Sequence, residues 1–113
     1  MPHVRRLGTE AEDRAAEFLA AQGYTLLTRR YKAAGGELDL VALDGETLAF
    51  IEVKRRRRSD PLDSIDTAKQ QRIFAAADLY LARYDGTKGE VRFDVVTEDE
   101  RGLSLHKDAF RPR

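Results

Sequence analysis

Cysteine is absent from the 113-residue chain, which excludes disulfide scaffolds, thiolate metal sites and cysteine nucleophiles. Long hydrophobic runs are absent too, because apolar stretches such as residues 48–51 are far too short to cross a bilayer. No apolar stretch follows the two arginines near the start of the chain, as a secretory signal would require. Internal repeats and Pro/Gly/Ser-rich linkers are also missing. We therefore expect one cytoplasmic domain, residues 1–113, with no membrane contact.

A net charge of either sign is absent as well, because 20 Lys+Arg residues balance 20 Asp+Glu residues. This balance counts against a simple nucleic-acid binder, whose domain is usually strongly basic. The charges are nevertheless unevenly placed. Residues 54–58 are five cations in succession, and acidic residues gather on both sides of them. A neutral total can therefore contain a basic patch beside an acidic cluster.

Hydrophobic periodicity and turn residues predict seven secondary-structure elements. They are a helix (residues 9–22), three strands (24–31, 37–43 and 47–55), a second helix (66–84) and two strands (90–97 and 103–106). Asp44-Gly45 is a strong signal for the two-residue turn of a β-hairpin. The order α-β-β-β-α-β-β predicts an α/β fold in which helices pack against a mixed sheet.

The residues that carry chemistry cluster around the predicted hairpin. Because strand side chains alternate between faces, Glu52 and Lys54 project together, with Asp39 on the neighbouring strand. Two adjacent carboxylates cost free energy through mutual repulsion and desolvation unless a cation or a proton is supplied. Mg²⁺ is a natural cation for such a site, because it prefers oxygen ligands and keeps several waters. Lys54 beside it could stabilise an attacking hydroxide or the charge on a phosphoryl group.

A cross-strand salt bridge is the alternative explanation of these residues, with Lys54 simply neutralising Glu52 or Asp39. Glu12 favours the metal site, because helical periodicity places it about 20° from Leu19, on the inward flank of the first helix. A third carboxylate directed toward the sheet is unusual for a solvated surface. At this point both interpretations remain open.

An ordered set of motifs makes the chain resemble a known family. The motifs are Gly8-x-x-Ala11-Glu12, Gly23-Tyr24, Gly36-Glu37-Leu38-Asp39-Leu40, Phe50-Ile51-Glu52-Val53-Lys54-x-Arg56, Lys69-Gln70-x-Arg72, Arg92-Phe93-Asp94-Val95 and Ala109-Phe110. They resemble the YraN family of small bacterial proteins, which is related to archaeal Holliday-junction resolvases. Asp39 followed by Glu52-Val53-Lys54 is similar to the signature of the PD-(D/E)XK nuclease superfamily. The resemblance runs from Gly8 to Phe110, nearly the whole chain.

The resemblance implies a restriction-endonuclease-like fold with α-β-β-β-α-β core order. It also implies a Mg²⁺- or Mn²⁺-dependent endonuclease that hydrolyses DNA phosphodiester bonds, with branched or structured DNA among its substrates. Asp39 and Glu52 would be metal ligands, Lys54 the catalytic lysine and Glu12 the acid that completes the site. A protein of the same fold that binds nucleic acid without cutting it, or acts as a scaffold, is the alternative. The resemblance leaves a homodimer open, since resolvase-like folds often pair two sites.

The expected nucleic-acid contacts lie after the Glu-Val-Lys triplet and on the second helix. They are Arg55, Arg56, Arg57, Arg58, Lys69, Gln70 and Arg72. A solvated charged loop is the alternative for the arginines, and a helix-capping amide is the alternative for Gln70. Two departures from the family pattern bear on substrate positioning: Arg55 replaces the usual Thr or Ser, and Ser59-Asp60 replaces an aromatic-Gly pair. Arg92 and Asp94, on a later strand, are expected to form a structural ion pair.

Overall fold

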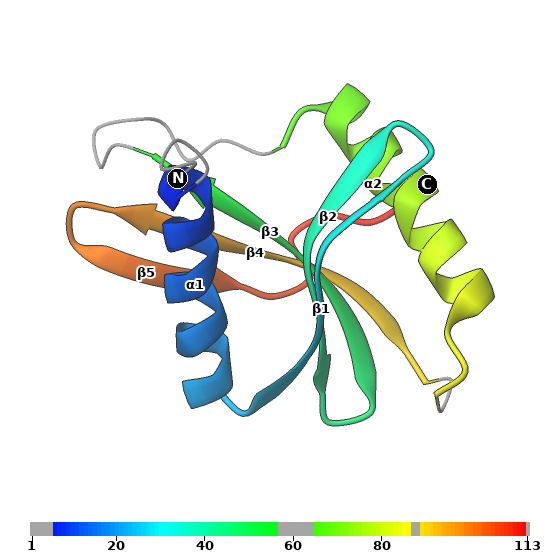
Figure 1. Cartoon of the computed structure of the whole chain (residues 1–113), viewed down its shortest axis with the longest axis horizontal. Coiled ribbons are helices and arrows are strands. Elements are labelled where there is room, and N and C mark those ends of the chain that lie inside the picture. The colour runs from blue at the N-terminus through cyan, green and yellow to red at the C-terminus, as the bar shows by residue number, and fades with distance from the viewer. Residues whose placement is uncertain (1–5, 57–64, 87–88, 113) are drawn as a thin grey trace.

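The computed structural model describes residues 6–56, 65–86 and 89–112, and gives side chains from residue 10 onward. It contains two helices and five strands in the predicted order (Figure 1). They are α1 (Arg6–Ala21), β1 (Tyr24–Ala33), β2 (Gly36–Asp44), β3 (Thr47–Arg55), α2 (Thr67–Arg83), β4 (Val91–Asp99) and β5 (Gly102–His106). The α/β prediction and the element order are therefore confirmed.

The five strands form one mixed sheet in the order β1-β2-β3-β4-β5. Neighbouring strands are antiparallel except β3 and β4, which are parallel. Antiparallel neighbours can be joined by tight turns, and Gly45, at φ +63°, provides the left-handed residue that the β2–β3 turn requires. Parallel neighbours need a long crossover connection, which α2 supplies between β3 and β4.

Each face of the sheet is covered by one helix, and strand alternation divides the core accordingly (Figure 1). Phe50 and Leu48 on β3 pack with Ile73 and the other buried residues of α2. Ile51, one residue along β3, packs on the opposite face with Leu19 of α1. Ile51 and Val53 thus anchor β3 from the face opposite Glu52, as alternation predicts.

Helix α2 begins at a defined cap. Asp66 is the N-cap, and its side chain accepts a hydrogen bond of 2.9 Å from the backbone N–H of Lys69. The side-chain amide of Gln70 donates to the carbonyl of Ile65 at 2.7 Å, which fixes the residue that precedes the cap. The predicted cap near Asp66 and the end of the helix at Tyr84 are confirmed.

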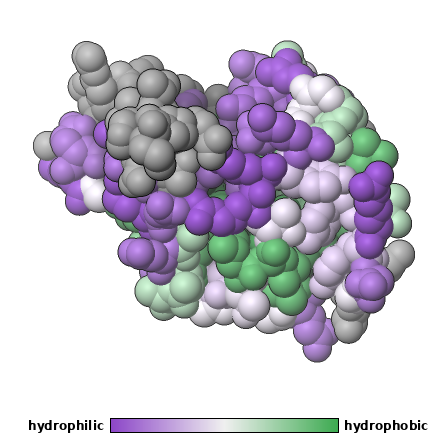
Figure 2. Space-filling model, viewed as in Figure 1, coloured by the Kyte–Doolittle hydropathy of each residue, from purple (hydrophilic) through white to green (hydrophobic). Residues whose placement is uncertain are grey.

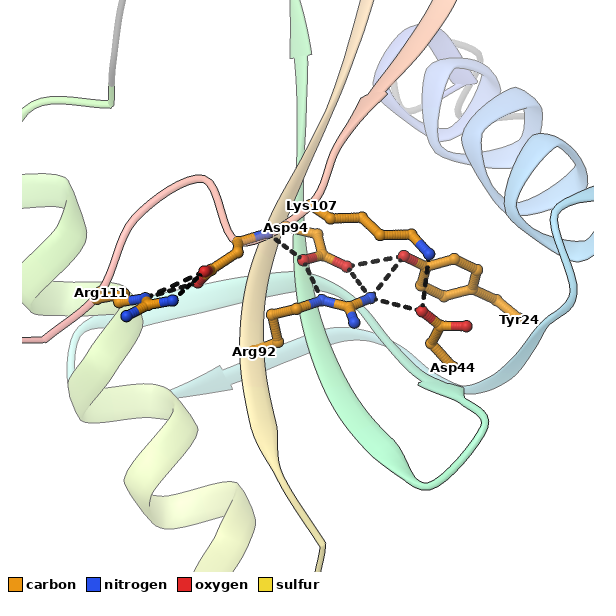
Figure 3. A network of polar contacts seen from close by, with 7 residues as sticks. Tyr24, Asp44, Arg92, Asp94, Lys107 and Arg111 are labelled. Carbon is orange, nitrogen blue, oxygen red and sulfur yellow. Dashed lines mark hydrogen bonds and ion pairs between the residues drawn. The ribbon is translucent and has the colours of Figure 1, made fainter.

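A buried ionic network joins the start of β1, the end of β2 and the start of β4 (Figure 3). Arg92 donates to both oxygens of Asp94, at 2.8 and 2.9 Å, and to Asp44 at 2.8 Å. The hydroxyl of Tyr24 donates to Asp94 at 2.8 Å and accepts from Arg92 at 2.9 Å. The expected Arg92–Asp94 ion pair is confirmed, in a larger network that includes Lys107.

The face seen in Figure 2 is mostly hydrophilic and carries an apolar patch near its centre. Two of the exposed large hydrophobic residues, Leu26 and Leu27, belong to the edge strand β1. The pairing of β1 with β2 is irregular between Leu26 and Thr28, and such a bulge discourages a second molecule from pairing with the edge. Within the described part of the chain, neither helix has the length and apolar composition to span a membrane.

Candidate active site

The site begins where β2 and β3 separate. Their regular pairing runs from Asp44 opposite Thr47 to Leu40 opposite Ile51. At the next residue, the carboxylate of Asp39 accepts a hydrogen bond of 2.8 Å from the backbone N–H of Val53. The side chain of Asp39 therefore takes the place of a backbone partner and is held against β3, beside Glu52.

Asp39 and Glu52 form a close acid pair in a poorly solvated place. Glu52 is only 5% exposed. Burial, followed by the charge of Glu52, raises the pKa of Asp39 to about 8; the hydrogen bond with Glu52 and the charge of Glu12 add to this, and the Val53 N–H opposes it. Asp39 therefore holds its proton more tightly than an ordinary carboxyl group, and a divalent cation would favour its ionised form.

Lys69 reaches this acid pair from the first turn of α2. Its ammonium forms an ion pair with Oε2 of Glu52, and the charge of Asp39 also acts on it. Burial lowers the pKa of Lys69, but the interactions with Glu52 and Asp39 outweigh it, so the pKa is raised overall. The sequence placed Lys69 among the phosphate contacts and gave no indication of its contact with Glu52, because that contact depends on how α2 packs against β3.

Glu12 is buried at 8% exposure, as its helical position predicts, but its partner is an arginine. Its carboxylate accepts a hydrogen bond of 2.8 Å from Nε of Arg30. Arg30 lies on β1 between the residues that pair with Leu40 and Leu38 of β2, so it is close to Asp39. Its backbone φ of +57° is uncommon for a residue with a long side chain. No group of three or more metal-ligating side chains occurs in the described residues. Glu12 as a third metal ligand therefore stays a prediction.

Lys54 lies on the same face of β3 as Glu52, two residues farther along the strand. It is half-buried and sits opposite Thr97 of β4. It is not among the described residues that line the cleft beside the acid pair. Lys54 therefore shares a face of β3 with Glu52, as predicted. Its catalytic role stays a prediction.

A cleft of about 580 Å³ opens beside Asp39 and Glu52. It is lined by acidic side chains of β2 and β3 and by cations of β1 and α2. The lining residues include Lys32, Gly36, Glu37, Asp39, Glu52, Lys69 and Arg72. A negatively charged ligand in this cleft would contact the cations and would be repelled by the acids unless a metal ion lay between them.

Gly36 allows the β1–β2 turn to approach α2 closely enough to form the cleft. A Cβ atom at this position would overlap the backbone carbonyl oxygen of Arg72. The neighbouring Gly35 has φ +74° and no atom within 4 Å of an added Cβ. Gly36 is thus needed for close packing, and Gly35 for its backbone conformation.

Replacing Gly36 with alanine is expected to lower the free energy of unfolding by about 1–3 kcal/mol, because the turn or the helix must move. Urea unfolding would measure this change. Gly35→Asn is the matched control, since asparagine tolerates a left-handed backbone and finds open space there. Equal stability of Gly36→Ala and the wild type would show that the close approach is not required.

Two residues of the basic run, Arg55 and Arg56, contact Glu98 of β4. Arg14 of α1 holds this carboxylate with hydrogen bonds of 2.6 and 2.9 Å, and Arg55, 71% exposed, lies 3.4 Å from it. The backbone N–H of Arg56 donates to the carbonyl of Glu98 at 2.9 Å. The hydrogen bonds from Arg14, with its charge and that of Arg55, hold the pKa of Glu98 below its usual range. Arg57, Arg58 and the Ser59-Asp60 departure lie outside the described residues.

Two of the three contacts expected on α2 line the cleft, namely Lys69 and Arg72. Gln70 uses its amide to cap the start of the helix, which agrees with the alternative given for it from sequence. Phosphate binding by any of the three stays a prediction.

The donor set suits a hard divalent cation. Mg²⁺ is commonly held by one or two carboxylates together with water and substrate phosphates, rather than by a complete cage of protein ligands. Asp39 and Glu52 supply two carboxylates whose mutual repulsion a divalent cation would relieve. The adjoining cleft offers space for water and phosphate.

Comparison with known proteins identifies the family. Residues 11–97 match the family described as "Uncharacterised protein family UPF0102". A UPF0102 protein of Symbiobacterium thermophilum is 45% identical over 95 residues, which cover 81% of this chain and 80% of that protein. One of Hahella chejuensis is 42% identical over 111 residues, which cover 92% and 89%. These names state no activity. The chain belongs to the UPF0102 family, which is the YraN family that its motifs resemble.

Proposed function

We propose that this protein is a divalent-metal-dependent endonuclease that hydrolyses DNA phosphodiester bonds, with branched or structured DNA as its substrate class. The observation that carries the proposal is the close pair Asp39–Glu52, with its raised Asp39 pKa, at the wall of a cleft that is also lined by cations. Perturbed acids in a cleft mark a candidate functional site, and the cations that line the same cleft suit a phosphate ligand.

Asp39 and Glu52 would hold Mg²⁺ or Mn²⁺, with Asp39 kept in position by its hydrogen bond to the Val53 N–H. The bound ion supplies Lewis-acid stabilisation of phosphoryl charge and a lowered pKa for bound water. Lys54, on the same face of β3 as Glu52, orients the attacking water or stabilises the charge that develops on the phosphate. Glu12 is held by Arg30 and acts on the site through its charge.

The cations of the cleft bind the substrate backbone. Lys32 on β1 and Arg72 on α2 line the cleft with the acid pair. Each phosphate that a cation neutralises steepens the fall of affinity with salt by about one unit on a logarithmic scale. Arg72→Ser is therefore expected to weaken DNA binding similarly for all sequences and to flatten its salt dependence. Affinities measured at several salt concentrations check this, and an unchanged slope would remove Arg72 from the phosphate contacts.

A cleavage screen tests the proposal directly. The full chain is incubated with Mn²⁺ and a panel of linear, flap and four-way-junction DNAs, while calorimetry measures Mn²⁺ binding without DNA. Mn²⁺ binding and cleavage by the wild type, both lost in Glu52→Gln, would support the nuclease. Asp78→Asn is a matched control, since Asp78 is exposed on α2 and does not line the cleft. DNA binding with neither Mn²⁺ binding nor cleavage would instead support the non-cleaving protein.

A further inference from the structure

The acid pair already has a cation beside it, supplied by the protein. Lys69 is the third residue after the N-cap of α2, and its backbone N–H is fixed by the side chain of Asp66 at 2.9 Å. From this fixed start its side chain reaches Glu52 and pairs with Oε2. Its side chain is 47% exposed. The backbone of Lys69 is therefore held at the start of α2, while about half of its side chain is accessible to solvent.

We propose that Lys69 is an internal counter-cation, which neutralises Glu52 in the metal-free protein and is displaced toward the substrate phosphate when a divalent cation binds between Asp39 and Glu52. This inference rests on the proposed function and assigns to Lys69 a role beyond that of a surface phosphate contact. Lys69 competes with the metal for Glu52 and becomes a substrate contact only after displacement.

Competition for the same carboxylate is the first step of the argument. Glu52 is buried, so an ammonium and a divalent ion on its oxygens would repel each other strongly in a place of low dielectric. One of the two cations must withdraw. Lysine is suited to this, because its charge is carried on a flexible four-carbon stem and not in a rigid fork.

The surroundings of Lys69 indicate where its ammonium goes. Arg72 is one helical turn away, lines the same cleft, and its charge acts against that of Lys69. Two cations on one side of a cleft repel each other unless an anion lies between them. A substrate phosphate in the cleft is such an anion, and Lys69 and Arg72 would hold it from the helix side while the acids hold the metal from the sheet side.

A purely structural ion pair makes a different prediction. Removing the charge of Lys69 destabilises the metal-free protein under both explanations, because Glu52 loses its partner. Only the counter-cation explanation predicts both tighter metal binding without the lysine and release of the Lys69 ammonium when metal binds. Metal affinity and lysine accessibility, both measured without DNA, therefore separate the two.

The test measures Mn²⁺ binding to the full chain by calorimetry in the absence of DNA. Lys69→Met, which keeps the length of the stem and removes the charge, is expected to bind Mn²⁺ about tenfold more tightly than the wild type. Lys69→Arg should bind no more tightly than the wild type, because the competing charge is retained. Arg83→Met removes a cation from the exposed last turn of the same helix and should leave the affinity unchanged.

The wild-type protein offers a second measurement that needs no variant. An amine-modifying reagent, followed by mass spectrometry, reports the accessibility of each lysine. Mg²⁺ should increase the labelling of Lys69 severalfold while that of Lys107, which pairs with Asp44 at the other end of β2, stays constant. Labelling that is unchanged or reduced by Mg²⁺ would overturn the displacement.

The outcomes keep the two proposals apart. If the wild type binds Mn²⁺ and Lys69→Met binds it equally or more weakly, the counter-cation role is wrong and the proposed metal site stands. If neither protein binds Mn²⁺ or Mg²⁺, the metal site itself is wrong, and the role of Lys69 falls with it. Tighter binding by Lys69→Met together with increased labelling in the wild type supports both.

Discussion

Replacing Asp94 with alanine is expected to lower the free energy of unfolding by about 3–5 kcal/mol, the usual effect of removing one partner from a buried ion pair. Asp94 is completely buried, and it accepts hydrogen bonds from Tyr24, from Arg92 and, at 2.9 Å, from the backbone N–H of Asp108 (Figure 3). The variant would leave all of these donors without their acceptor, in a place that water does not reach easily. Arg92 would then be a partly buried cation with only Asp44 to neutralise it.

Urea unfolding of three variants measures how this network is built. Tyr24→Phe removes a single donor to Asp94 and should lower the free energy of unfolding by about 1 kcal/mol. Asp108→Asn should change stability little. Asparagine tolerates the left-handed backbone at φ +56°, and the substitution removes only the exposed ion pair with Arg111. A variant Asp94→Ala as stable as Asp108→Asn would show that the network does not hold the sheet together.

The ends of strands were predicted well where turn residues such as glycine define them. Strand β3 begins and ends at the predicted residues, 47 and 55. The two-residue turn before it is Gly45-Glu46, one residue later than the predicted Asp44-Gly45, because Asp44 still pairs with Thr47. Strands β1 and β2 are longer than predicted and meet in a turn at Ala34 and Gly35, both with positive φ. A strand's end depends on the partner with which it pairs, and a partner is not visible in a short window of sequence.

The acid pair could be predicted because it depends on short-range rules. Alternation places Glu52 on one face of β3, and the hairpin brings Asp39 beside it. The cationic partners could not be predicted in this way. Lys69 meets Glu52, and Arg14 meets Glu98 across 84 residues of sequence, only because helices pack on particular parts of the sheet. Glu12 was correctly placed on the inward side of its helix, but its pairing with Arg30 depends on an unusual backbone conformation.

Asp39→Asn is expected to stabilise the metal-free protein and to abolish its activity. Asparagine has the shape of the protonated carboxyl group, so it can still accept the Val53 N–H and can donate to Glu52. It cannot become ionised beside Glu52, and the repulsion within the pair is removed. At pH 8 we expect a gain of about 2–5 kcal/mol in the free energy of unfolding, because each unit by which folding raises the pKa of Asp39 corresponds to about 1.4 kcal/mol. If the protein is the nuclease proposed above, cleavage should fall by about 10³-fold or more, because a metal ligand is lost.

The pH dependence of this gain is the sharpest part of the prediction. The pKa of Asp39 is about 8 in the folded protein and about 3.9 in the unfolded chain, so its ionisation weakens the folded state. The free energy of unfolding of the wild type therefore falls as the pH rises from about 4 to about 8. Asp39→Asn has no ionisable group at this position, so this fall is absent. Urea unfolding of both proteins without metal at pH 5, 6.5 and 8 should show a widening difference, while Asp78→Asn should track the wild type. If Asp39→Asn is less stable than the wild type at pH 8 and Mn²⁺ does not stabilise the wild type, Asp39 and Glu52 belong to a structural ion pair with Lys69 and not to a metal site.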